Sequence, residues 1–188
     1  RDRTYPVGQT VSITGVGTIV IQSDGAYTFT PATDFNGLTP LIYYTATDIH
    51  GDSNVDELVI VVTPVNDNPV ARQDTPSTPE DAPVDGNVLD NDSDVDGDAF
   101  EVIQFIINGL GHNSGETVSL AEGDLTLNPD GSYFFIPAPD FNGSVPVVYY
   151  SIIDENGGYG SALLKITVSP VNDPPQSSDD IAFTDEDT

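Results

Sequence analysis

Short stretches of alternating apolar and polar residues recur along the chain, bounded by glycine, proline, asparagine or aspartate. Tyr27-Thr28-Phe29-Thr30 and Leu164-Lys165-Ile166-Thr167-Val168 place apolar side chains at every second position. A period of two is typical of a strand with one buried face. The 17 glycines and 15 prolines indicate many turns between short strands. We therefore predict an all-β protein.

The pattern repeats after 106 residues. Residues 24–71 align without a gap on residues 130–177, and 23 of these 48 positions are identical. In both copies Asp-Gly precedes alternating Tyr and Phe, so we predict a hairpin turn followed by a strand whose aromatic side chains face one core. Asp34-Phe35-Asn36-Gly37, repeated from Asp140, predicts a second turn.

Each copy of the repeat ends in a proline-bounded junction. Pro64-Val65-Asn66-Asp67-Asn68-Pro69 returns as Pro170-Val171-Asn172-Asp173-Pro174-Pro175. Proline lacks a donor N–H and fixes φ, so the preceding strand ends there. We expect residues 1–66 to be the later part of a first β-sandwich repeat and 67–172 a complete second one. Residues 173–188 would be a linker and the opening strand of a third.

Residue 1 corresponds to residue 107, so the first repeat is expected to lack its opening strands. Such a truncated sandwich would expose an unpaired sheet edge. One hypothesis is strand exchange, in which the tail after Asp173 of a neighbouring molecule docks at this edge. The alternative is that the structural domain boundary differs from the repeat boundary.

Charge excludes several classes of partner. The chain has 31 Asp and Glu against 4 Lys and Arg, a formal charge of -27. Nucleic acid and anionic membrane surfaces would be repelled. No apolar run approaches the roughly 20 residues that span a bilayer, so direct membrane insertion is not expected. Cations are the natural counterpart.

The densest acidic run contains a calcium-type spacing. Asp92-Ser93-Asp94-Val95-Asp96-Gly97-Asp98 matches D-x-D-x-D-G, which winds alternate carboxylates around one centre. The EF-hand pattern then fails, because its twelfth position is Ile103 rather than a bidentate Glu. The run is either a calcium loop of another type or a solvated acidic turn.

Residues for enzyme chemistry are few, and we predict that the chain is not an enzyme. It has no Cys, hence no thiol nucleophile, and no Trp to line a sugar site. Its carboxylates crowd turns and linkers rather than a cleft. His50 and His112 lie in unrelated loops without a second His nearby. The Tyr and Phe positions are most simply core.

The motifs taken together resemble the bacterial cadherin-like tandem repeats of large RTX adhesins. They are, in chain order, Pro79-Glu80-Asp81, Val88–Asp98, Asp140-Phe141-Asn142-Gly143, Tyr149-Tyr150, Asp154–Gly158 and Pro170-Val171-Asn172-Asp173. The resemblance implies tandem Greek-key β-sandwich domains with Ca²⁺ at their junctions. It also implies type I secretion, a place on the extracellular bacterial cell surface and a role in cell adhesion and biofilm. The module would be an extender that holds a distal binding domain, outside this chain, away from the cell.

The resemblance also implies ligand positions. Asn66, Asp67 and Asn68 resemble the family's linker, Glu80 and its match Glu186 the acidic residue near the first strand, and Asp94 and Asp96 the D-x-D pair. Asp48 and Asp154 could reach a junction or cap a turn. Pro174 replaces the second linker Asn, which puts one ligand in doubt there. The full candidate set is Asp48, Asn66, Asp67, Asn68, Glu80, Asp81, Asp92, Asp94, Asp96, Asp98, Asp154, Asn172, Asp173 and Glu186.

A rival interpretation is an adhesive domain that binds sugar or protein directly. Such a domain is expected to interrupt the repeat with an inserted loop or an exposed aromatic patch. The gap-free alignment argues against it. Residues 109–115, Gly-Leu-Gly-His-Asn-Ser-Gly, form a mobile-looking loop that would be its candidate site. Otherwise we expect the partners to be neighbouring repeats of the same chain.

Overall fold

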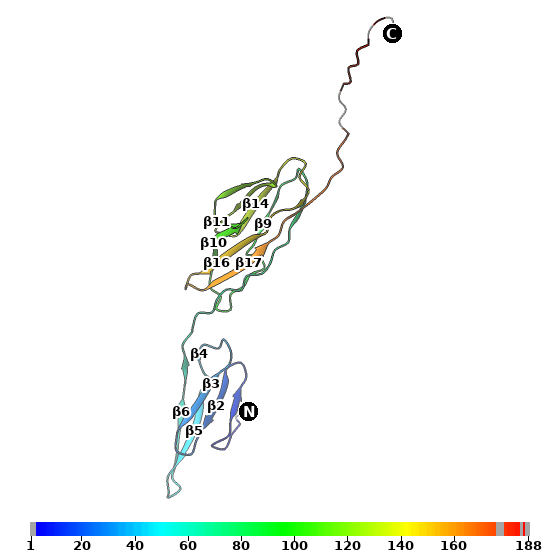
Figure 1. Ribbon diagram of the computed structural model, residues 1–188. Coiled ribbons are helices and arrows are strands. Elements are labelled where there is room, and N and C mark those ends of the chain that lie inside the picture. Colours follow the sequence, from blue (N-terminus) through cyan, green and yellow to red (C-terminus); the bar gives the residue numbers. More distant parts are fainter. Residues whose placement is uncertain (1–2, 176–178, 185, 187–188) are drawn as a thin grey trace. The chain divides into compact units, whose positions relative to one another are not determined.

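The all-β prediction is confirmed. The computed structural model describes residues 3–175, 179–184 and 186, and these residues form 18 β-strands and no helix (Figure 1). None of the described segments is therefore a helix long and apolar enough to cross a membrane. The chain divides into two compact units. The first runs up to Asn68 and includes Asp94–Asp98, and the second comprises Pro69–Ser93 and everything from Ala99 onward.

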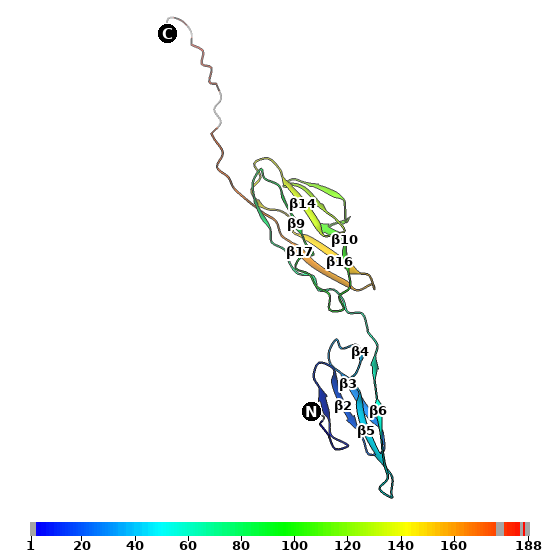
Figure 2. The ribbon, with the colours of Figure 1, turned by 180° about the vertical axis from the view of Figure 1, so that it is seen from behind.

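The second unit contains two four-stranded sheets and one smaller sheet. One sheet has the order β11-β10-β16-β17, the other β12-β13-β14-β9, and the smaller one β15-β18-β8 (Figures 1 and 2). The strands are β8 (Ser77–Pro79), β9 (Val84–Asn87), β10 (Phe100–Ile107), β11 (Leu110–Asn113), β12 (Thr117–Leu120), β13 (Gly123–Leu127), β14 (Ser132–Pro137), β15 (Gly143–Ser144), β16 (Val148–Asp154), β17 (Tyr159–Leu164) and β18 (Thr167–Ser169).

The two large sheets of this unit pack face to face around one core. Alternate residues of both sheets, among them Phe105, Leu125, Phe135, Tyr150 and Ile152, are 0% exposed and belong to one buried cluster. This is the period of two that the sequence pattern predicts. Strands β12, β13 and β14 follow one another as hairpins while β9 lies beside β14, which is Greek-key connectivity.

The first unit contains counterparts of the last seven strands of the second. They are β1 (Val11–Ile13), β2 (Gly17–Ile21), β3 (Tyr27–Pro31), β4 (Gly37–Leu38), β5 (Ile42–Thr47), β6 (Ser53–Leu58) and β7 (Val61–Val62). Their sheets have the orders β1-β2-β3, β4-β7 and β5-β6. The predicted Asp-Gly hairpin is confirmed, because β2 and β3 pair antiparallel across Asp24 and Gly25.

Among the described residues, β8 to β11 have no counterparts in the first unit. In the second unit β9 pairs with β14, β10 with β16 and β8 with β18. The matching edges of β3, β5 and β7 have no partner strand among the described residues of the first unit.

The expectation that the Tyr and Phe positions are core is only partly right. Tyr133 and Tyr150 are 7% and 0% exposed, but their counterparts Tyr27 and Tyr44 are 54% and 40% exposed. Tyr27 and Tyr44 are more exposed because their strands, β3 and β5, lack a neighbouring strand among the described residues. In the second unit β9 and β10 provide these neighbours beside β14 and β16. Tyr149 is 56% exposed because it lies on the outer face of β16, where side-chain burial alternates.

The prediction of a mobile-looking loop at residues 109–115 is wrong. Leu110–Asn113 form β11, which pairs with β10 across a tight turn at Asn108 (φ 53°) and Gly109 (φ 76°). His112 stacks on Phe105 with ring centroids 5.4 Å apart and lies 3.5 Å from the Glu116 carboxylate. Residues 110–113 are therefore part of a sheet rather than an inserted loop.

The predicted third repeat lies partly outside the described residues, since 176–178, 185, 187 and 188 are not described. The described tail residues 179–184 and 186 contain no strand. At the other boundary, the first unit extends to Asn68, where the repeat pattern places its end at residue 66. The opening strand of a third repeat stays a prediction.

Candidate metal centres

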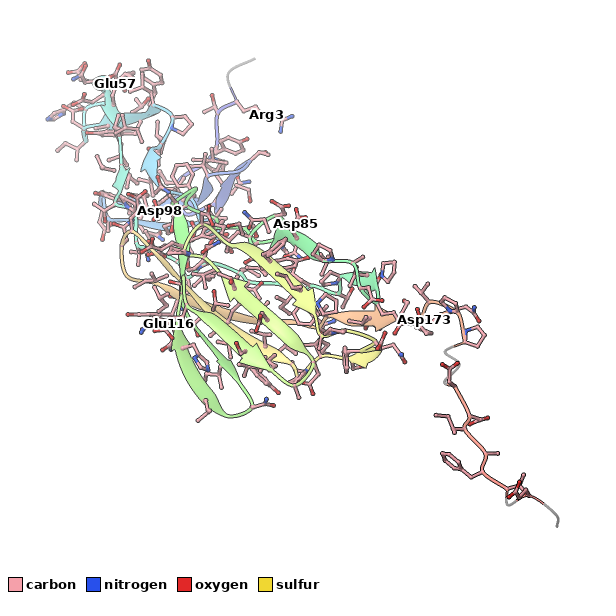
Figure 3. The ribbon with its side chains drawn as sticks, turned by 90° about the horizontal axis from the view of Figure 1, so that it is seen from above. Arg3, Glu57, Asp85, Asp98, Glu116 and Asp173 are labelled. Carbon is pink, nitrogen blue, oxygen red and sulfur yellow. The ribbon has the colours of Figure 1, made fainter. Side chains whose placement is uncertain are left out.

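Three carboxylates meet at one end of the second unit. One oxygen each of Asp81, Asp140 and Asp173 lies within 4.8 Å of the others, and all three side chains are exposed. Asp81 follows β8, Asp140 precedes β15, and Asp173 lies just after β18, where the chain leaves the unit (Figure 3). The small β15-β18-β8 sheet thus brings together residues far apart in the sequence. We call this group the exit cluster.

Glu80 holds the loops of the exit cluster in place by hydrogen bonds. Its side chain is 5% exposed, and one carboxylate oxygen accepts a hydrogen bond from the Val171 backbone N–H. The other oxygen accepts one from the Asn142 side-chain amide at 3.0 Å. These bonds, that from Val171 first, lower the pKa of Glu80. A buried carboxylate therefore ties the two loops that carry Asp140 and Asp173 to β8.

The carboxylates of the exit cluster repel one another. The pKa of Asp173 is raised by desolvation and then by the charges of Asp140, Glu80 and Asp81. Asp81 and Asp140 also adopt positive φ values of 62° and 58°, uncommon for non-glycine residues. Uncommon backbone conformations and clustered negative charge are both features of functional sites, and a bound cation would offset the repulsion.

A second group, which we call the loop cluster, is formed by Asp94, Asp96 and Asp98 in the first unit. Their ligand atoms also lie within 4.8 Å of one another. One oxygen of Asp94 accepts the backbone N–H groups of Asp96, Gly97 and Asp98 at 2.8, 3.1 and 3.4 Å. This folds the D-x-D-G segment into a tight turn. The other oxygen of Asp94 is buried and has no hydrogen-bond partner among the described residues, a costly state that a cation would relieve.

The junction segment of the first unit contacts the loop cluster. The Asp67 backbone N–H donates to the Asp96 carboxylate at 2.7 Å. Asp34, Asn36, Asp67 and Asp96 line a common pocket. Asp34 corresponds by repeat to Asp140 and has nearly the same φ, 59°. The described first-unit residues thus reproduce part of the exit cluster.

Asp92 does not belong to the loop cluster, although the D-x-D-x-D-G spacing predicts that it lies with Asp94, Asp96 and Asp98. The buried Tyr150 hydroxyl lies 3.4 Å from an Asp92 oxygen, 3.1 Å from an Asp74 oxygen and 2.9 Å from the Arg72 carbonyl. The other Asp92 oxygen accepts the Arg72 backbone N–H at 2.7 Å. Desolvation raises the pKa of Asp92, and raises that of Asp74 to about 6. We call Arg72, Asp74, Asp92 and Tyr150 the tyrosine cluster, and the sequence does not predict it.

Asp48 and Asp154 both cap turns in the structure, which is one of the two roles that the sequence leaves open for them. Asp48 accepts backbone N–H groups of His50 and Asp52 at 2.8 and 2.9 Å, and Asp154 accepts those of Asn156 and Gly158 at 2.9 and 2.8 Å. Asp48 lies in the turn between the paired strands β5 and β6, and Asp154 is the last residue of β16, where the turn to its partner β17 begins. Neither belongs to the exit or the loop cluster.

The remaining candidates are linker residues and the tail. Asn66 and Asn68 lie in the strandless segment after β7. Asn172 donates its side-chain amide to the Asp173 carbonyl at 3.3 Å, and Glu186 is exposed. Their roles as ligands stay predictions.

Sequence reasoning missed four residues of these sites, Asp34, Asn36, Asp140 and Asn142, because Asp-Phe-Asn-Gly was interpreted only as a turn. The available signal was its gap-free recurrence at the same offset as the junction. A turn held at a constant distance from an oxygen-rich junction is a reasonable ligand candidate.

The chain matches two protein families, one of which is a repetitive domain of a surface adhesin. Residues 66–170 match the bacterial cadherin-like domain, and residues 2–59 match the surface adhesin CshA repetitive domain. No curated protein matches the chain.

One matching solved structure is described as a nucleoside hydrolase-related hypothetical protein from Saccharophagus degradans that is associated with carbohydrate metabolism. It is 16% identical with a TM-score of 0.36, and the match covers 56% of this chain and 26% of that one. The chain thus spans about a quarter of that structure's length, and the likeness carries no argument about activity.

Proposed function

Because the chain belongs to the bacterial cadherin-like domain family, we propose that it is a calcium-binding extender module of a large bacterial surface adhesin. The family and the CshA-type repeat support a structural rather than a catalytic role and a place outside the cell. RTX-type adhesins, type I secretion and biofilm belong to this proposal through the sequence resemblance. A distal domain outside this chain would bind the target surface.

The observation that carries the calcium proposal is the exit cluster. Ca²⁺ takes 6–8 oxygen ligands at about 2.3–2.6 Å and prefers carboxylates and carbonyls. Asp81, Asp140 and Asp173 supply three carboxylates within 4.8 Å of one another, and Glu80 already holds the surrounding loops. Backbone carbonyls and water would complete the shell. Binding would offset the charge repulsion that, after desolvation, contributes to the raised pKa of Asp173.

The loop cluster is the second proposed calcium site. Asp94, Asp96 and Asp98 would provide ligands, with Asp67 and Asp34 from the pocket that Asp96 lines. The buried Asp94 oxygen without a hydrogen-bond partner supports it. Asp92 accepts hydrogen bonds from Tyr150 and Arg72. It would therefore stabilise the segment that precedes the loop rather than bind the ion.

Calcium would stiffen the string of repeats. Residues 94–98 follow strands of the second repeat in the chain but fold with the first unit. An ion held by this loop and by the Asp67 segment would restrict the connecting chain. Calcium at about 100 times its dissociation constant stabilises a folded site by about 2.7 kcal/mol. The module would thus be pliant in a calcium-poor cytoplasm and stiff outside.

The first experiment is small-angle scattering with a thermal melt, in millimolar calcium and in chelator. We expect calcium to increase both the maximum dimension and the melting temperature. Unchanged shape and stability in both buffers would refute the calcium role.

Variants locate the ions. Asp140→Asn should weaken one calcium-binding step in calorimetry, and Asp96→Asn a different one. Asp124→Asn is the matched control, because Asp124 is an exposed residue of β13 outside both clusters, and it should bind calcium as the parent does. Equal calcium binding by all three variants would contradict the assignment of the sites.

A further inference from the structure

The sheet β11-β10-β16-β17 of the second unit has one face that points away from the core. Successive side chains of a strand point to opposite faces of its sheet. On β16, Tyr150 and Ile152 are buried in the core, so Tyr149 lies on the opposite face, where it is 56% exposed. Tyr159 on β17 pairs with Ile153 and lies on the same face, 60% exposed. We call this surface the outer face.

The strand registers arrange the outer face in rows across the sheet. The first two rows, one apolar and one polar, are Ile106, Tyr149, Leu163 and Gln104, Ser151, Ser161. A third row contains Ile153 and Tyr159, with Glu101 beside Ile153 at its end. The two exposed tyrosines therefore lie on either side of a row of hydroxyl and amide groups.

The outer face carries little charge, although the chain has a formal charge of -27. Of the residues in the three rows, Glu101 alone is charged, and it lies at the end of its row. An acidic partner would be repelled by the rest of the chain. A basic partner would find a single carboxylate here. The face therefore suits an uncharged partner.

The repeat does not require apolar residues at these positions in order to fold. At the 106-residue offset, Tyr159 and Leu163 correspond to Ser53 and Glu57 of the first unit. The strands β5 and β6 pair with the same relative register as β16 and β17. The apolar side chains of the outer face are thus separate from the folding pattern. Exposed apolar patches of this kind mark binding surfaces.

The polar row decides between kinds of uncharged partner. An apolar protein surface would cover the Gln104 amide and the Ser151 and Ser161 hydroxyls without giving them hydrogen-bond partners, which is costly. A sugar offers hydroxyls to these groups, and its C–H faces pack on aromatic rings. A second copy of the chain is disfavoured, because two chains of formal charge -27 repel each other.

We propose that the outer face of the second unit binds a neutral polysaccharide. Tyr149 and Tyr159 stack on sugar rings, and the polar row between them bonds to sugar hydroxyls. The two tyrosines are four residues apart along the strands and one strand apart across the sheet, about 14 Å in a regular sheet. The site therefore takes an extended oligosaccharide segment rather than a single sugar.

This activity goes beyond the extender role and is compatible with it. The binding residues lie on regular paired strands, so the module needs no inserted loop to hold a glycan. None of them belongs to the exit or the loop cluster. Glycan binding and calcium binding can therefore be tested separately.

Affinity electrophoresis of the whole chain tests the site. Native gels contain hydroxyethylcellulose, laminarin, dextran or galactomannan as neutral polysaccharides, and are run with calcium and with chelator. Carboxymethylcellulose is the charged match for hydroxyethylcellulose, because both have the same backbone. We expect at least one neutral polysaccharide to slow the chain in at least one buffer, and carboxymethylcellulose not to slow it.

Variants at the two tyrosines locate the site. Tyr149→Ala and Tyr159→Ser should each lower the affinity about tenfold, whereas Tyr149→Phe, which keeps the ring, should bind as the parent does. Phe134→Thr is the matched control. Phe134 is 42% exposed on the outward side of β14 in the other large sheet, and its counterpart in the first unit is Thr28. This variant should also bind as the parent does.

A variant of the polar row separates sugar from apolar partners. Ser161→Val removes a hydroxyl and introduces the residue type of the matching Val55, which favours strands. We expect it to lower the affinity for the polysaccharide about threefold. An apolar partner would instead bind this variant more tightly. A thermal melt of each variant shows that it is folded.

The proposal is overturned if no neutral polysaccharide slows the chain in either buffer, or if Tyr149→Ala and Tyr159→Ser bind as the parent does. Loss of binding in Phe134→Thr alone would place the site on the other sheet and also overturns it. Self-association in sedimentation that Tyr149→Ala abolishes, without polysaccharide binding, would assign the outer face to a second copy. That result overturns the proposal as well.

Discussion

At the scale of single residues, the tyrosine cluster shows how one hydroxyl can organise several acceptors. Tyr150 lies within hydrogen-bond distance of four oxygens but has one proton to donate. Desolvation, and the neighbouring Asp92 and Asp90 charges, raise the pKa of Asp74 to about 6, although bonds from Tyr150 and Asn91 oppose the shift. A protonated Asp74 would provide a second donor among these oxygens.

The raised pKa of Asp74 predicts a pH effect on stability. The folded state binds the Asp74 proton more tightly than the unfolded state, so the unfolding free energy falls as pH rises from about 4 through about 6. Asp74→Asn removes this term. We expect the variant to gain on the order of 1 kcal/mol relative to the parent between about pH 4 and about pH 7.

Urea unfolding of parent and variant in chelator measures this difference. Asp85→Asn is a suitable control, because Asp85 is an exposed residue of β9 outside the tyrosine cluster. A difference between parent and Asp74→Asn that is independent of pH would contradict the raised pKa.

At the scale of elements, the first residue of β13 requires glycine. Gly123 has φ +144°, and a Cβ there would overlap the Ile136 carbonyl oxygen on the paired strand β14. Gly17 occupies the matching place on β2 with φ +148° and meets the Thr30 carbonyl. The close approach of two backbones is therefore built into the repeat.

Gly123→Ala is expected to lower the unfolding free energy of the second unit by about 2–4 kcal/mol, through backbone strain and steric overlap. Gly111→Ala, in β11, should change it by less than about 0.5 kcal/mol, because no heavy atom lies within 4 Å of the added Cβ. Chemical denaturation of both variants provides the comparison. Equal effects would show that the close approach at Gly123 is relieved at little cost.

At the scale of the whole molecule, negative charge dominates. With 31 acidic and 4 basic side chains, the folded chain repels itself, and salt should screen this repulsion. In chelator, the melting temperature should rise with sodium chloride as the Debye length falls from about 30 Å at 0.01 M to about 3 Å at 1 M.

Calcium chloride at the same ionic strength separates screening from binding. Occupied sites add stabilisation beyond the screening, and this addition should saturate with calcium concentration. If sodium and calcium salts gave the same melting curve at each ionic strength, charge screening alone would explain the stabilisation.

The sequence alone determined the features that depend on local pattern. A period of two, turn residues and proline-bounded junctions specify an all-β chain of repeats, because each reflects the preferences of neighbouring residues. The gap-free repeat also identified the junctions, and the spacing of the aspartates identified the acidic D-x-D-x-D-G run.

Only the tertiary structure decided which carboxylates meet and which repeated side chains are buried. Asp81, Asp140 and Asp173 converge because three short strands pair across the second unit, and Asp92 leaves its spacing partners to face Tyr150. Tyr44 and Tyr150 share a residue type and a repeat position, yet one is exposed and the other buried. Burial and ligand geometry depend on strands distant in sequence, and the local pattern carries no record of whether those strands are present.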